Sequence, residues 1–104
     1  MVYRKKADAA MADELFLYTD NDGQLYRQQK RPIEKNLCRK IKKGIYSKQK
    51  SVKLWGYLMD SAAKKYCKDM TCDRVWHQEF NKATRMKAAK MFADYFDDVK
   101  KEIC

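Results

Sequence analysis

The chain has few helix-breaking residues and no long apolar run. It contains one proline and three glycines in 104 residues. Gly23, Gly44 and Gly56 are far apart in the sequence, which excludes a glycine-rich phosphate-binding loop. No run approaches the length of a membrane span, and the first twelve residues carry basic side chains without an apolar stretch. We therefore expect no signal peptide, no membrane partner and a cytoplasmic protein, whose four cysteines are thiols rather than disulfides.

The composition suits one small globular domain with a localised positive charge. Hydrophobic residues make up 45% of the chain and charged residues 37%, which excludes both a disordered chain and one buried in lipid. The net charge is +10, and residues 31–70 hold 12 of the 24 Lys and Arg but only 3 of the 14 Asp and Glu. This localisation predicts a basic surface that attracts polyanions.

Apolar residues at helical spacing predict a mainly α fold, a compact domain of three to four helices. The predicted helices cover residues 33–43, 47–70, 74–80 and 82–103, with Pro32 opening the first and Gly44 ending it. We expect the helices over 47–70 and 82–103 to form the main core pair. The predicted interior consists of Trp55, Leu58, Met59, Ala62, Tyr66, Trp76, Phe80, Ala89, Phe92 and Phe96.

The first thirty residues suggest a different local structure. Residues 1–13 start no clear pattern, so we expect a frayed or partly helical arm before a single domain over 14–104. Two short β-prone runs flank the segment 20–23, which predicts an N-terminal β-hairpin over 14–29. The same segment resembles the centre of an EF-hand calcium loop, but Tyr18 and Gln29 would replace its first and last carboxylates, so we favour the turn.

The part of the chain from Gly44 onward carries a resemblance. The residues concerned are GIYSKQKSVKLWGYLMDSAAKKYCKDM, followed by WHQEFNKATRMKAAKMFADYF. This pattern of residues resembles that of small helical proteins encoded by phages and other mobile elements. The resemblance implies a phage or plasmid origin and a host-cell cytoplasmic setting, and it implies no activity and no site.

The basic middle of the chain is the strongest candidate site. Its lysines favour contact with backbone phosphates over the reading of bases, and a tyrosine between two predicted helices is placed to stack on a base or sugar. We therefore predict a non-catalytic protein that binds DNA or RNA, or a host nucleoprotein complex. The predicted site residues are Lys35, Arg39, Lys40, Lys42, Lys43, Tyr46, Lys48, Lys50 and Lys53.

Candidate catalytic and metal sites are weaker. A zinc site would have to combine Cys38, Cys67, Cys72 and His77, whose spacing is wider than that of known zinc motifs. Cys72 and His77 form the one conceivable nucleophile and base, but nothing marks an oxyanion site. The carboxylates Asp94, Asp97 and Asp98 have the spacing of a solvated helix face. We expect no enzyme activity, no metal and no cofactor.

A second class of function stays open from the sequence. The protein would then be a host-interaction protein or inhibitor, acting in anti-defence or host takeover, that masks a host protein surface without binding nucleic acid. Its contact would be the acidic end, Asp94 to Glu102, or the edge of the hairpin. Removing the lysines of 35–53 would separate the two classes. The sequence leaves open whether the protein forms a homodimer.

Overall fold

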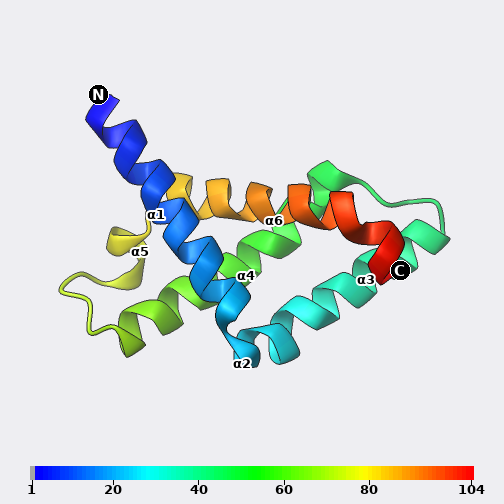
Figure 1. The fold of residues 1–104 in the computed structure, drawn as a ribbon, viewed down its shortest axis with the longest axis horizontal. Helices are drawn as coiled ribbons and strands as arrows, with labels where there is room; N and C mark the ends of the chain where they lie inside the picture. Colours follow the sequence, from blue (N-terminus) through cyan, green and yellow to red (C-terminus); the bar gives the residue numbers. More distant parts are fainter. Residues whose placement is uncertain (1) are drawn as a thin grey trace.

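The computed structural model describes the backbone of residues 2–104 and the side chains of residues 9–104. It is mainly helical, as predicted, and the described residues contain no strand (Figure 1). No helix in this part of the chain is long and apolar enough to cross a membrane. The elements are α1 (Val2–Asn21), α2 (Gly23–Leu25), the π-helix η1 (Tyr26–Lys30), α3 (Arg31–Lys42), α4 (Lys48–Asp69), α5 (Trp76–Glu79) and α6 (Lys82–Ile103).

The two longest core helices, α4 and α6, form the central pair and run antiparallel. Their direction follows from two cross-helix ion pairs, since Lys48 meets Asp94 whereas Asp60 meets Arg85. Asparagine and serine side chains cap the N-termini of the pair, as their preference for this position leads one to expect. The ring of Trp55 stacks on Phe92, with ring centroids 5.5 Å apart. Tertiary packing of these apolar faces is the main source of helix stability here.

The predicted β-hairpin over 14–29 is wrong. Leu15 and Thr19 are fully buried on one face of α1, and the Thr19 hydroxyl donates to the Leu15 carbonyl at 2.7 Å. Phe16 lies 4.4 Å from Phe92 between ring centroids, so α1 packs across the central pair (Figure 1). The β-prone residues therefore form part of a helix, because tertiary packing overrides their weak intrinsic preference for a strand.

The predicted arm over 1–13 is part of the same helix. Val2–Asn21 is one continuous helix, and Ala12 is fully buried in the core. Met1 and the side chains of residues 2–8 lie outside the described part of the chain. The helix therefore runs through the boundary that the sequence suggested at residue 13.

The Asp20–Gly23 segment forms a corner between helices rather than a strand turn. Asp22 caps α2 by accepting from the Leu25 N–H at 2.9 Å, and its second oxygen pairs with Lys65 of α4 at 2.5 Å. Asp20 accepts from Lys30 at 3.1 Å. Two carboxylates of the calcium-loop resemblance are thus bound to lysines, and the described residues hold no cluster of three or more metal-ligating side chains.

A shift of the hydrogen-bond register joins η1 to α3. The Arg31 N–H donates to the Tyr26 carbonyl five residues earlier, directly before Pro32, which has no N–H to donate. Lys30 ends this wide turn and is only 7% exposed. Its ammonium pairs with Asp20 and lies 5.7 Å from the centroid of the Phe92 ring. This buried cation ties the start of α3 to α1 and α6.

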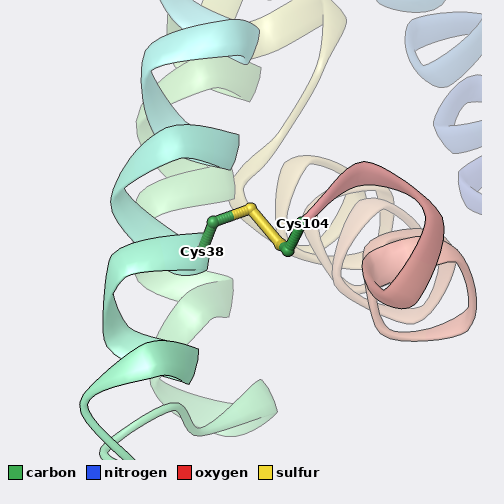
Figure 2. Close-up of a disulfide and its surroundings, with 2 residues drawn as sticks. All are labelled: Cys38 and Cys104. Atoms are coloured by element: carbon green, nitrogen blue, oxygen red, sulfur yellow. A yellow bond between two sulfur atoms is a disulfide. The ribbon is translucent and has the colours of Figure 1, made fainter.

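A disulfide joins Cys38 of α3 to Cys104, which follows α6 (Figure 2). The expectation that all four cysteines are thiols is therefore wrong for this pair and holds for Cys67 and Cys72. The two bonded residues are 66 positions apart in the sequence, and the fold brings their Cα atoms to 5.4 Å. That expectation rested on the cellular compartment alone, which says nothing about which cysteines meet.

The carboxylate of Asp22 should contribute measurably to the loss of folding stability in acid. The hydrogen bond from Lys65 lowers the pKa of Asp22 below its ordinary value. A lowered pKa stabilises the fold at neutral pH, and this contribution disappears as the pH falls through the folded-state value. We expect Asp22→Asn, which keeps a capping side chain, to flatten the loss of stability below about pH 4. Asp22→Ala should cost about 1 kcal/mol more, because it also removes the cap.

Urea unfolding of the three proteins between neutral and acidic pH tests this. Identical pH profiles for wild type and Asp22→Asn would contradict the role of the ion pair. Equal stability of the Asn and Ala variants would contradict the role of the cap.

Reduction of the disulfide should lower stability. Closing a loop of this length stabilises a fold by about 4 kcal/mol on the chain-entropy model. We expect the Cys38→Ser/Cys104→Ser variant to unfold at lower urea than the oxidised protein, and a reductant to shift only the wild type. Thiol titration in denaturant should find two free thiols before reduction and four after it. Four thiols in the protein purified without reductant would contradict the bond.

Candidate nucleic-acid interface

A stripe of four cations runs along the exposed face of α3. Arg31, Lys35, Arg39 and Lys42 follow one another at steps of four, four and three residues, which places them on one side of a helix. All four are exposed, whereas Leu37 on the inward side is 1% exposed. The segregation follows from the sequence, because an amphipathic helix buries its apolar face and leaves its charges outside. We call these four residues the α3 stripe.

The α3 stripe borders a cavity of about 440 Å³. The other wall is formed by Ile103 and by the Cys38–Cys104 disulfide. This disulfide joins the C-terminal end of the chain, after α6, to α3 (Figure 2). The covalent bond therefore holds the second wall of the cavity against the helix that carries the cations.

The α3 stripe has no ion-pair partner among the described side chains. Within residues 9–104, none of its four side chains forms an ion pair, whereas cations elsewhere do. Glu34 is the one carboxylate side chain in the cavity wall, and it is 8% exposed. Burial raises the pKa of Glu34, against the opposing effect of the nearby Lys30 and Arg31. The cavity rim therefore carries an excess of positive charge.

The structure divides the predicted basic site into parts. Lys35, Arg39 and Lys42 belong to the α3 stripe, and the exposed Lys43 follows it at the end of the helix. Four others of the predicted set lie off the stripe. Lys40 is half-buried, Lys50 is exposed on α4, Lys48 pairs with Asp94 at 2.5 Å, and Lys53 lines a separate hollow between α4 and α6.

Arg31 is the member of the stripe that the sequence did not reveal. The predicted helix began at residue 33, so Arg31 stood outside its face. In the structure, η1 continues directly into α3 and places Arg31 one turn before Lys35. The four-residue step from Arg31 to Lys35 is consistent with one helix face, but Pro32 suggested that the helix begins after Arg31.

Tyr46 has a structural environment that differs from the expected one. Its hydroxyl donates to Asp97 at 3.2 Å, and its ring centroid lies 5.9 Å from that of Phe96. The Lys100 ammonium lies 5.1 Å from the ring centroid. Burial is the main cause that raises the pKa of Tyr46. Stacking on a base would require this half-buried ring to lose the cation above it.

Gly44 ends α3 as predicted. Its φ is +72°, and the Ile45 N–H donates to the Lys40 carbonyl at 3.0 Å in the pattern of a left-handed C-cap. The same pattern ends α4, where Thr71 has a φ of +53° and the Cys72 N–H donates to the Cys67 carbonyl at 3.2 Å. This second cap brings two free cysteines together.

The proposed zinc ligands are not assembled. Cys38 is bonded to Cys104, and His77 packs on Trp76 with ring centroids 5.4 Å apart. Burial, together with a hydrogen bond to Cys72, raises the pKa of the Cys67 thiol to about 12. Such a thiol is a poor nucleophile at neutral pH, because the thiolate is the reactive form.

The acidic end of α6 is partly used within the fold. Asp94 pairs with Lys48, and Asp97 accepts from Lys100 at 2.8 Å, which is the main cause that lowers the pKa of Asp97. Asp98 and Glu102 are exposed. If the protein instead contacts a host protein, only part of the predicted acidic surface is free for that contact. The predicted hairpin edge is absent from the described residues.

No family model, curated protein or solved structure matches the chain. The resemblance to proteins of phages and other mobile elements stays a prediction, as does a cytoplasmic location.

Proposed function

We propose that the protein binds nucleic acid without catalysis, through the phosphates of the backbone and the α3 stripe. One observation carries the proposal: four exposed cations share one helix face, and none forms an ion pair within residues 9–104. Each phosphate that such a cation neutralises releases condensed counterions, which is the main source of sequence-independent affinity.

The length of the stripe supports contact with several phosphates. From Arg31 to Lys42 the helix axis extends about 16 Å. One strand of duplex DNA carries a phosphate for about every 3.4 Å of axis, so the stripe spans about five of them. Two arginines among the four cations add planar donors that suit bidentate contact with phosphate oxygens.

Duplex is the favoured form of the ligand. Single-strand binding proteins rely on exposed aromatic rings that stack on bases. The ring predicted for this purpose, Tyr46, is engaged with Phe96 and Lys100. The exposed ring beside the α3 stripe is that of Tyr26, whose hydroxyl accepts a hydrogen bond from Arg31 at 3.3 Å and whose centroid lies 5.6 Å from the Lys30 ammonium. The stripe therefore offers mainly charge, which matches the backbone of a duplex better than unstacked bases.

Charge reversal on the stripe should abolish binding. We expect Lys35→Glu/Arg39→Glu/Lys42→Glu to weaken binding to labelled duplex DNA by about 100-fold or more at low salt, and to reduce the salt slope by about 0.9 for each lost contact. The matched control is Lys68→Glu/Lys87→Glu/Lys90→Glu, which changes three exposed lysines on other faces and alters the net charge equally.

Fluorescence anisotropy over a salt series measures both quantities, with single-stranded DNA and duplex RNA as further ligands. Equal weakening by the two triple variants would show that net charge alone attracts the duplex. Absence of binding by wild type at low salt would overturn the proposed function.

Substitution of Glu34 should strengthen binding to DNA, whereas charge reversal of the α3 stripe should weaken it. Glu34→Gln removes a carboxylate from the cavity wall and keeps the size of the side chain. Because this carboxylate opposes a phosphate, we expect the variant to bind duplex DNA several-fold more tightly at constant salt. Unchanged or weaker binding, with an unchanged circular dichroism spectrum, would place the phosphates away from this cavity.

A further inference from the structure

A second hollow, of about 410 Å³, lies between α4 and α6. Its middle is formed by Val52 and Gly56 of α4 and by Ala89 of α6. Two large apolar side chains border it, Tyr57 at 58% exposed and Met86 at 46% exposed. We call this hollow the Gly56 groove. Its lining among the described side chains comes entirely from the two central helices, without any from α1 or α3.

Gly56 is unexplained by the fold of its own chain. It lies inside α4, where glycine lowers helix stability relative to alanine. Its backbone does not have a positive φ. A Cβ atom built at this position would meet nothing within 4 Å. The expected reason for such a glycine, the close approach of another helix of the same chain, is therefore absent among the described residues.

The lining residues follow helical spacing on both walls. On α4, residues Val52, Gly56 and Asp60 follow at steps of four. On α6, Lys82, Arg85 and Met86 lie within one turn, and Ala89 follows at a step of three. Two antiparallel helices with such stripes leave a furrow of the kind that a third helix fills by ridge-into-groove packing.

The charges at the rim define the chemistry of that third helix. Lys53 and Lys82 are exposed and form no ion pair within residues 9–104. Arg85 and Asp60 neutralise each other at 2.6 Å across the end of the groove. The rim is therefore positive around an apolar middle.

We propose that the Gly56 groove docks an acidic amphipathic helix of a partner protein. The partner places one large apolar side chain in the space above Gly56, between Tyr57 and Met86. Its flanking carboxylates meet Lys53 and Lys82. This is the helix-in-groove mode of recognition, in which apolar anchors at helical spacing supply the affinity.

The proposal is independent of nucleic-acid binding. Among the groove residues only Lys53 belonged to the basic surface predicted from the sequence, and the groove shares no lining residue with the cavity beside the α3 stripe. Either function can therefore fail without the other.

Gly56 also provides the test, because a larger side chain fills the groove without entering the core. Gly56→Leu should keep the fold and block the groove, and Gly56→Ala should raise the melting temperature by a few degrees through helix propensity. The matched control is Ser61→Leu, which adds an apolar side chain to α4 in a different hollow, one that Gln28 and Lys65 also line.

The probes are synthetic peptides of about 18 residues, long enough for five helical turns. Each has leucines at steps of three and four and glutamates on both flanks, and the central apolar position is alanine, leucine or phenylalanine. A scrambled peptide of the same composition has no apolar face. Binding is followed by amide chemical shifts and by fluorescence anisotropy.

We expect wild type and Ser61→Leu to bind with an affinity that rises from the alanine to the phenylalanine peptide. The shifts should centre on Val52, Gly56, Tyr57 and Met86. Gly56→Leu should bind at least tenfold more weakly and lose the dependence on the central side chain, while its binding to duplex DNA stays unchanged. The charge-reversed α3 stripe variant should still bind the peptides.

Four results with the peptides would overturn the proposal, and so would one result without them. These are the absence of groove shifts in wild type with any of the three peptides, equal binding of the scrambled peptide, equal affinity of Gly56→Leu, and shifts confined to α3. A concentration-dependent dimer that Gly56→Leu abolishes would also overturn it, because the occupant would then be a second copy of this chain.

Discussion

The ring of Phe92 is the contact on which the other elements depend. It is 1% exposed, and three elements meet on it. Trp55 of α4 stacks at 5.5 Å between centroids, Phe16 of α1 lies at 4.4 Å, and the buried Lys30 ammonium lies at 5.7 Å. Aromatic rings bury large areas and also attract cations to their faces, so one side chain serves both apolar packing and the placement of a charge. The start of α3, and with it the α3 stripe, is positioned through this ring.

The distribution of ion pairs explains why the α3 stripe is left without partners. Acidic residues are concentrated in α1, in the corner after it and in α6, and several are engaged with lysines that hold helices together. Helix α3 has Glu34 as its one acidic residue, and that side chain is buried. The inward face of α3 is otherwise mainly apolar, so the four cations of the α3 stripe point outward, where no carboxylate of the described chain forms an ion pair with them. An unneutralised surface of one sign is suited to a ligand of the opposite sign.

The two proposed surfaces belong to different parts of one scaffold. The α3 stripe is fixed to the central pair at one end by the contact of Lys30 with the Phe92 ring and further along by the Cys38–Cys104 disulfide. The Gly56 groove is a property of the central pair itself, because its described lining comes from α4 and α6 alone. Lys53 shows that closeness in sequence does not decide which surface a residue belongs to. It lies ten residues after Lys43, yet it borders the groove and not the cavity beside the stripe.

The sequence by itself determined the helices from Pro32 onward, because their apolar residues recur at helical steps and their ends carry Gly44, Ser47 and Asn81. It also located the positive charge. It did not determine the first thirty residues, since side chains such as Leu15 and Thr19 suit either a strand or a buried helix face, and only packing against the central pair decides between them. The tertiary structure likewise decided the pairing of Cys38 with Cys104, the contact of Tyr46 with Asp97 and the open space above Gly56. Each depends on which residues distant in sequence become neighbours, and local pattern carries no information about that.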